Sequence, residues 1–572
     1  MTATFATKFG DEDEEAVERA PINAEREAEI ENEIVEQQKP TLDEFIVLGR
    51  YTFIVCCLCE AMILLQLGCM FFMIYAGAEP TLVSCGDFRF DHVLDTKARC
   101  AALAELNANA TANGQPACTP EFSYQFRSVN VDWQYFCGSN KLVKQSISIQ
   151  MIGVIVGSAI FGQLSDAYGR KPVLIVALLL CLASMAASSI TNDLLTFTIT
   201  RFIVNVFNGG NIAIQLVYTV ENLPSKSRFW ITNLIPWSPN IALFALVAYL
   251  AGDWRTLIYA SGVLAIPGFF LLIFCSESPR YLIQTQQLEK ARAVIQRIWR
   301  IDGRQLDERR LDEMLQAEAD AAVEQKKTKK RYGFWHLFYT AEMTRYTCAI
   351  GLSTLCASLI TYSLLFNMEK LSGSIYINGV ILGLFRYALN VATAVMDVKF
   401  KWMGRKLIHA LAEVYIIVGL VFFVVVYFLG LQHSLRSFTS IVILTILGQT
   451  TLIYTTNGIL SSELFPTGVR NTSFSFGQVL SRLGVVIAPQ LFFLTDLWTP
   501  LPYVVILVAT CVDLVSFHLN IKETKGQPMN DRFPPKTASW LHQRNLATKR
   551  KAALSRELLP VADVEGNPVV LP

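Results

Sequence analysis

Long apolar runs alternate with short polar stretches along most of the chain. Runs of about 20 apolar residues suffice to cross a hydrocarbon core of roughly 30 Å in helical form. The pattern predicts twelve membrane-spanning helices, over residues 51–75, 146–164, 172–190, 194–220, 229–251, 256–274, 346–366, 376–397, 407–428, 438–460, 474–494 and 501–521. We therefore expect an all-α polytopic membrane protein with two six-helix bundles, 51–275 and 346–521, joined by a polar segment at 276–345.

Composition agrees with this reading. Of the 572 residues, 52% are hydrophobic and only 17% are charged, whereas a soluble protein of this size needs more charge to cover its surface. The net charge of +1 gives no electrostatic reason to expect a nucleic-acid partner. The lipid bilayer is therefore an expected partner.

The basic residues of the short loops predict the orientation. Loops on one side carry Arg170, Lys171, Lys226, Arg228, Lys399, Lys401, Arg405, Lys406 and Arg470, while those on the other side carry only Arg255, Lys370 and Arg436. The positive-inside rule then places the central segment and both termini, 1–50 and 522–572, in the cytoplasm. The first fifty residues are acidic, with DEDEE at 11–15, and do not resemble a signal peptide.

The first outer loop, 76–145, is long and contains four of the thirteen cysteines, Cys85, Cys100, Cys118 and Cys137. Outside the cell these thiols are expected to form two disulfides, and three pairings are open. The same loop contains the sequon Asn109-Ala110-Thr111, which makes Asn109 a predicted glycosylation site.

Two charged motifs occur twice. ENLPSKSR begins at Glu221 and ELFPTGVR at Glu463, 242 residues later, and GRK occurs at 169–171 and again at 404–406. These acids end helices and these cations begin them, against the helix dipole in each case, so we expect them to meet at the cytoplasmic face. The matched spacing indicates an internal duplication, as in transporters. The predicted gating residues are Asp166, Arg170, Glu221, Arg228, Arg405, Glu463 and Arg470.

Several motifs together resemble a known family. GQLSDAYGRKP at 162–172 resembles the signature loop of the major facilitator superfamily, and ESPR at 277–280 and ETKG at 523–526 resemble marks of its sugar and organic-ion branches. The chain is similar to the organic anion/cation transporter family of solute carriers at GDWR (252–255), SSELFPTGVRN (461–471) and SRLGVVIAP (481–489). The resemblance implies the twelve-helix major facilitator fold and alternating-access transport of small organic ions across the plasma membrane, without enzymatic activity.

One position departs from the family pattern. The family has an acid three residues before the second GR pair, as Asp166 stands before Gly169, but this chain has Lys401 there. The nearest acid is Asp397. We therefore expect either a different cytoplasmic lock in the second half or an insertion in the eighth helix.

Ionisable residues inside membrane helices cost about 2.5–3.5 kcal/mol each on insertion scales, so they are functional candidates. Arg386 and Arg482 fall near the middle of the eighth and eleventh helices, where two guanidinium groups would suit a carboxylate or sulfonate. By the resemblance, Arg482 stands where anion carriers have arginine and cation carriers an acid. The alternative is a permanent pair of either arginine with Glu60.

Aromatic residues complete the predicted substrate pocket. By the resemblance Tyr362 matches a family tyrosine, and Trp237 and Tyr454 are further candidates. Organic anions are therefore the favoured substrate. A cation or zwitterion carrier would use Glu60 instead, a sugar porter would need a glutamine pair that the seventh helix lacks, and a sensor that never transports would have the same sequence pattern.

The remaining charges in the helices are expected to be structural. Glu413 and Asp513 fall at similar depth in the ninth and twelfth helices and are predicted to share a proton or a partner. The six histidines show no metal-binding spacing, and no Walker loop is present. We therefore predict no metal, no cofactor and no catalytic residue.

Overall fold

The structure is a computed structural model that describes residues 42–525 except 91–95, 114–115, 117, 225–230, 232–236, 329–332 and 401, together with 534 and 539. Three basic residues counted above, Lys226, Arg228 and Lys401, lie outside the described residues. So does most of each tail.

Eleven helices of the described residues are long and apolar enough to cross a membrane. They are α3 (Arg50–Met70) with its continuation α4 (Phe72–Ala76), α7 (Asn140–Tyr168), α8 (Arg170–Ser189), α9 (Leu194–Glu221), α12 (Trp254–Phe274), α16 (Ala341–Leu365), α17 (Ile375–Lys399), α18 (Arg405–Phe428), α19 (Arg436–Glu463), α20 (Thr467–Leu491) and α21 (Leu501–Asn520). The shorter apolar helix α11 (Trp237–Ala251) stands at the predicted fifth span.

The largest extensions beyond the predicted spans are at helix starts. The helix α7 begins at Asn140, six residues before the predicted start, because the polar residues that precede the apolar run continue the helix. One of them, Lys144, is buried against the second bundle. The length of an apolar run reflects the thickness of the hydrocarbon core, and helices extend beyond that core where their polar ends have hydrogen-bond partners.

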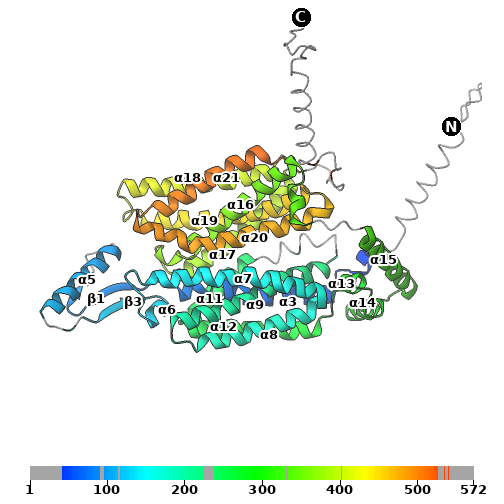
Figure 1. The fold of residues 1–572 in the computed structure, drawn as a ribbon, viewed down its shortest axis with the longest axis horizontal. Coiled ribbons are helices and arrows are strands. Elements are labelled where there is room, and N and C mark those ends of the chain that lie inside the picture. Colours follow the sequence, from blue (N-terminus) through cyan, green and yellow to red (C-terminus); the bar gives the residue numbers. More distant parts are fainter. Residues whose placement is uncertain are drawn as a thin grey trace, which may run out of the picture.

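The helices form two bundles that lie side by side (Figure 1). The first contains α3, α7, α8, α9, α11 and α12, and the second contains α16 to α21. The bundles meet where α7 packs on α20 and α11 packs on α17. In the order of the two halves, α17 is the counterpart of α7 and α20 is the counterpart of α11. The two contacts are therefore equivalent, which agrees with the predicted duplication.

One end of the bundles carries the first outer loop, and we call it the sheet end (Figure 1). The loop contains a three-stranded antiparallel sheet in the order β2-β1-β3 and two helices. These elements are β1 (Thr81–Cys85), β2 (Phe88–Arg89), β3 (Pro120–Ser123), α5 (Thr96–Ala112) and α6 (Val129–Asp132).

Of the three open pairings of the loop cysteines, the structure has Cys85 bonded to Cys118 and Cys100 bonded to Cys137. The first disulfide ties β1 to the chain just before β3, and the second ties α5 to the chain before α7. Asn109 is exposed on α5, and its glycosylation stays a prediction.

The opposite end, which we call the tail end, carries the central segment (Figure 1). Its polar sequence folds into the helices α13 (Pro279–Gln284), α14 (Leu288–Asp302) and α15 (Glu308–Thr328) and the short helix η1 (Phe334–Phe338). The first three pack with α2 (Leu42–Phe45) around a small apolar core of their own. Two further short helices, η2 (Met368–Lys370) and η3 (Phe492–Asp496), follow α16 and α20 at the sheet end.

Candidate functional site

A cavity of about 420 Å³ lies between the two bundles. Its lining comes from α3, α9 and α11 of the first bundle and from α16, α17, α19 and α20 of the second. Five of the six predicted substrate residues line it, namely Trp237, Tyr362, Arg386, Tyr454 and Arg482. The sixth, Glu60, does not.

The two arginines carry the only formal charges among the described lining residues. Arg386 is buried, and its Nε has no hydrogen-bond partner among the described residues. Arg482 is half-buried, and its Nη1 lies 3.7 Å from Sδ of Met70. Both guanidinium groups lie close enough to the hydroxyls of Tyr362 and Tyr454 to interact with them electrostatically. The cavity is therefore a positively charged space lined by aromatic and polar groups.

Glu60 has a different partner from the one weighed above. Its Oε2 accepts a hydrogen bond from Nδ2 of Asn240 on α11 at 2.5 Å, and no ion pair joins it to either arginine in the part of the chain that the structure describes. A permanent Arg482–Glu60 pair is thus absent from this conformation. N–H groups of the cavity arginines, such as Nε of Arg386, are therefore available to a ligand.

Three aromatic rings close the cavity toward the sheet end. Phe71, the single residue between α3 and α4, contacts Trp237 and Tyr362 with ring centroids 6.4 and 6.1 Å apart. Beyond them Tyr75 stacks on Tyr376 at 5.9 Å, which joins the first bundle to the second. Sequence reasoning missed Phe71 because an aromatic residue in an apolar helix looks like ordinary packing.

Amide and hydroxyl groups frame the rest of the cavity, and sequence reasoning missed them as well. Gln66 donates to Gln215 at 2.7 Å, which in turn donates to Sγ of Cys59 at 2.7 Å. On the second bundle Tyr454 donates to Ser358 at 2.8 Å. Polar amides inside apolar helices were the available signal, since they are costly in a membrane unless they face partners or a cavity.

Charged contacts tie the bundles together at the sheet end. Lys144 of α7 donates to Oδ1 of Asn367 at 2.7 Å and pairs with Glu79 at 3.0 Å and, more loosely, with Glu369 of η2 at 3.9 Å. In addition, the Ser148 hydroxyl donates to a backbone carbonyl of α20 at 2.8 Å. These contacts lie between the cavity and the sheet, so the cavity is closed on that side.

The predicted gating residues gather at the tail end. In the first bundle Arg170 pairs with Asp166 at 2.9 Å and with Glu221 at 3.2 Å. The carboxylate of Glu277 accepts from the backbone N–H groups of Arg170 and Lys171 at 3.2 and 3.0 Å. Burial raises the pKa of Glu277 against the opposing effect of these hydrogen bonds. The acid therefore caps the start of α8 and complements its dipole.

The second bundle repeats this arrangement. Arg405 pairs with Asp397 and, at 3.7 Å, with Glu463. Glu523 accepts from the backbone N–H groups of Arg405 and Lys406 at 2.9 and 3.1 Å. Asp397, in the last turn of α17, thus takes the role that Asp166 has in the first bundle, which accounts for the missing acid at 401.

Each of these ion pairs of Arg170 and Arg405 joins two helices of the same bundle. Of the other two gating candidates, Arg470 is half-buried at the start of α20 and Arg228 lies outside the described residues. The proposed gating role of the set stays a prediction. In this conformation the ion pairs at the tail end connect helices within each bundle, whereas the Lys144 contacts to Asn367 and Glu369 join the two bundles at the sheet end.

The chain matches the sugar (and other) transporter family over residues 89–531. It is 29% identical over 439 residues to an organic cation transporter-like protein of Drosophila melanogaster, which covers 73% of this chain and 74% of the relative. It is 26% identical over 384 residues to organic anion transporter 3 of Mus musculus, covering 66% and 69% of the two chains.

Among solved structures, the partially occluded inward-open conformation of the xylose transporter XylE from E. coli is similar in fold. The TM-score is 0.57 at 15% identity, covering 84% of this chain and all of that one. The same transporter is described elsewhere as a major facilitator superfamily symporter. The predicted fold is thereby confirmed. The chain belongs to the sugar (and other) transporter family, and it is a membrane transporter with the twelve-helix major facilitator fold rather than an enzyme.

Proposed function

We propose that this protein is an alternating-access secondary transporter that moves small organic anions across the plasma membrane. The observation that carries the proposal is the pair of arginines, Arg386 and Arg482, which are the only formal charges among the described residues that line the cavity. Relatives named for organic anion and organic cation transport support the substrate class in its broader form. A cation carrier would need an acid in the cavity, and Glu60 is bonded to Asn240 outside the lining.

The charge of the cavity favours an anionic ligand for a physical reason. Two guanidinium groups in a space screened from water are costly unless an opposite charge compensates them. A carboxylate or sulfonate supplies that charge and accepts two parallel hydrogen bonds from a guanidinium. The hydroxyls of Tyr362 and Tyr454 add neutral donors beside it, and Phe71 and Trp237 suit an apolar or aromatic body.

The loop charges and the disulfides support the orientation that we propose. Both termini and the segment 276–345 face the cytoplasm, and the disulfide-bonded sheet faces outward. The conformation described above is then closed toward the outside, with its cavity on the cytoplasmic side of Phe71. The described lining comes from both bundles of a single chain, so we propose a monomer as the transport unit.

Uptake measurements test the function directly. Cells that express the protein are expected to accumulate a labelled aromatic carboxylate or sulfonate above vector controls, normalised to surface protein, and to exclude a labelled tetraalkylammonium ion. Uptake of the ammonium ion without the anion would reverse the substrate assignment. Binding without flux of either would identify a sensor instead of a carrier.

The contacts that close the cavity toward the sheet end are expected to become more stable as the outside pH falls. Burial raises the pKa of Glu369 in the closed state, with the neighbouring Glu79 carboxylate adding to the rise and Lys144 and Lys370 opposing it. Burial also disfavours the charged form of Glu79, but the Lys144 and Lys370 ammonium groups outweigh it and hold its pKa at about 2. Opening exposes Glu369 and returns its pKa toward the ordinary value, so protonation as the outside pH falls stabilises the closed state.

The measurement is labelling of the cavity thiol Cys59 by a membrane-impermeant reagent added outside intact cells, read by mass spectrometry. Labelling, normalised to that of free cysteine at the same pH, is expected to fall as the outside pH is lowered, and Glu369→Gln is expected to flatten the profile. Lys144→Met removes the central cation and is expected to increase labelling, whereas Lys399→Met, at an exposed lysine of the tail end, is the control. Stronger labelling in acid would contradict the prediction that protonation stabilises the closed state.

A further inference from the structure

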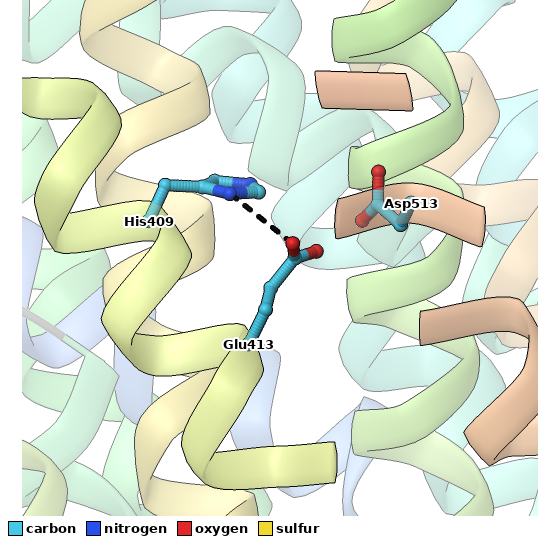
Figure 2. A group of neighbouring side chains, drawn as sticks. All are labelled: His409, Glu413 and Asp513. Carbon is cyan, nitrogen blue, oxygen red and sulfur yellow. Dashed lines mark ion pairs between the residues drawn. The ribbon is translucent and has the colours of Figure 1, made fainter. Parts of the chain in front are cut away.

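A second polar cluster lies inside the second bundle, away from the cavity. His409 and Glu413 stand one turn apart on α18, and Asp513 faces them from α21 (Figure 2). The three side chains are 0%, 0% and 1% exposed. One ligand atom from each lies within 4.8 Å of the others, and Nδ1 of His409 is 3.5 Å from Oε2 of Glu413.

The converging atoms lack donors. Nδ1 of His409, both carboxylate oxygens of Glu413 and Oδ1 of Asp513 are buried without a hydrogen-bond partner among the described residues. Two carboxylates buried side by side in a membrane bundle repel each other and lose their hydration, so they require a cation between them. A single proton bridges two oxygens at most, whereas a metal ion coordinates all three side chains.

We propose that His409, Glu413 and Asp513 bind a divalent metal ion of the zinc class. The two carboxylates neutralise a divalent ion, and an electrically neutral site is what the membrane interior favours. The donor set of one imidazole and two carboxylates suits Zn²⁺ better than Mg²⁺ or Ca²⁺, which prefer oxygen ligands alone. Ligands about 2.0–2.1 Å from a tetrahedral Zn²⁺ lie roughly 3.3 Å apart, close to the 3.5 Å between Nδ1 and Oε2.

Outer contacts orient the imidazole for this role. Nε2 of His409 is 2.8 Å from Oγ of Ser353, and Nδ2 of Asn457 donates to the same hydroxyl at 2.8 Å. The ring also stacks on Phe517 at 3.5 Å. With Nε2 occupied, Nδ1 is the nitrogen left for a metal, as is usual where a partner holds the other ring nitrogen of a metal-binding histidine.

The site joins α18 to α21, and none of its three ligands lines the cavity. Its expected effect is to hold these two helices together so that the second bundle moves as one body. The sequence prediction that Glu413 and Asp513 share a proton or a partner is consistent with this placement. The prediction of no metal site is the one that our proposal revises, because Asp513 lies 100 residues from Glu413 and no local motif includes all three ligands.

The experiment measures metal in the full-length protein, purified in detergent through a tag without histidines and without added chelator. We expect about one zinc ion per chain by inductively coupled plasma mass spectrometry. Glu413→Gln and Asp513→Asn are expected to lose most of it and to unfold at lower temperature. His433→Ala changes an exposed histidine and is expected to retain the metal. Ser353→Ala is expected to weaken zinc affinity about 10- to 100-fold.

X-ray absorption spectroscopy of the wild-type protein identifies the metal ligands even if the variants fail to fold. The proposal requires nitrogen and oxygen ligands near 2.0–2.2 Å, whereas sulfur at about 2.3 Å would place the ion on some of the nine free cysteines. Sulfur ligation, or wild-type protein without bound metal, overturns the proposal. Metal-free wild type together with a fully stable Glu413→Gln variant would indicate a shared proton instead.

Discussion

The Arg482→Asp variant is expected to abolish uptake of labelled organic anions while it still reaches the cell surface. The substitution replaces attraction with repulsion in a cavity whose other described charge is Arg386, so anion binding is lost rather than weakened. Arg482→Lys keeps the charge but loses the bidentate geometry. The loss of one charged hydrogen bond, about 1.5–3 kcal/mol, corresponds to a roughly 10- to 100-fold rise in KM.

Uptake of a labelled aromatic carboxylate, normalised to surface protein, is the measurement. Arg436→Lys makes the same substitution at the start of α19, outside the cavity, and is expected to leave KM unchanged. A structural Arg482–Glu60 pair would instead predict that each single variant fails to fold and that the charge-swapped double variant recovers. The Glu60–Asn240 hydrogen bond argues that the swap will not restore function.

The Arg170→Ala variant is expected to lower the stability of the first bundle strongly. Arg170 is 7% exposed, pairs with Asp166 and Glu221, and lies over the ring of Tyr281 at 4.7 Å. Removing one member of a buried ion pair leaves the others uncompensated and costs about 3–5 kcal/mol. Asp166→Asn is expected to cost only about 0–1 kcal/mol, because the Asp166 side chain is 75% exposed.

Thermal unfolding of the purified variants and their surface expression measure this difference. Arg309→Ala removes an exposed arginine of α15 and serves as the control. An Asp166→Asn variant with normal stability but slow uptake would assign that carboxylate to the transport cycle itself, as the sequence comparison of the two GRK motifs predicts. Normal stability of Arg170→Ala would show that the network is dispensable for folding.

The ion-pair networks of Arg170 and Arg405 show which features could be predicted from the sequence. The spacing of Glu221 and Glu463 and of the two GRK motifs identified the duplication and the end of the bundle where the charges gather. The sequence alone did not show that the acid missing at 401 is replaced by Asp397, because that depends on where α17 ends relative to Arg405. Nor did it show that each of these ion pairs joins two helices of the same bundle.

The membrane spans and the cavity arginines were determined by the sequence itself, because hydrophobic length and the cost of a buried charge are properties of a short segment. The fold was predicted from the motifs that resemble the family. Tertiary structure decided what depends on contacts distant in sequence. One disulfide pairing out of three forms, and the Phe71 ring contacts Tyr362 at the cavity. Glu60 bonds to Asn240, and Asp513 lies beside His409 and Glu413. Side-chain partners between helices depend on how the helices cross, and no local pattern encodes that geometry.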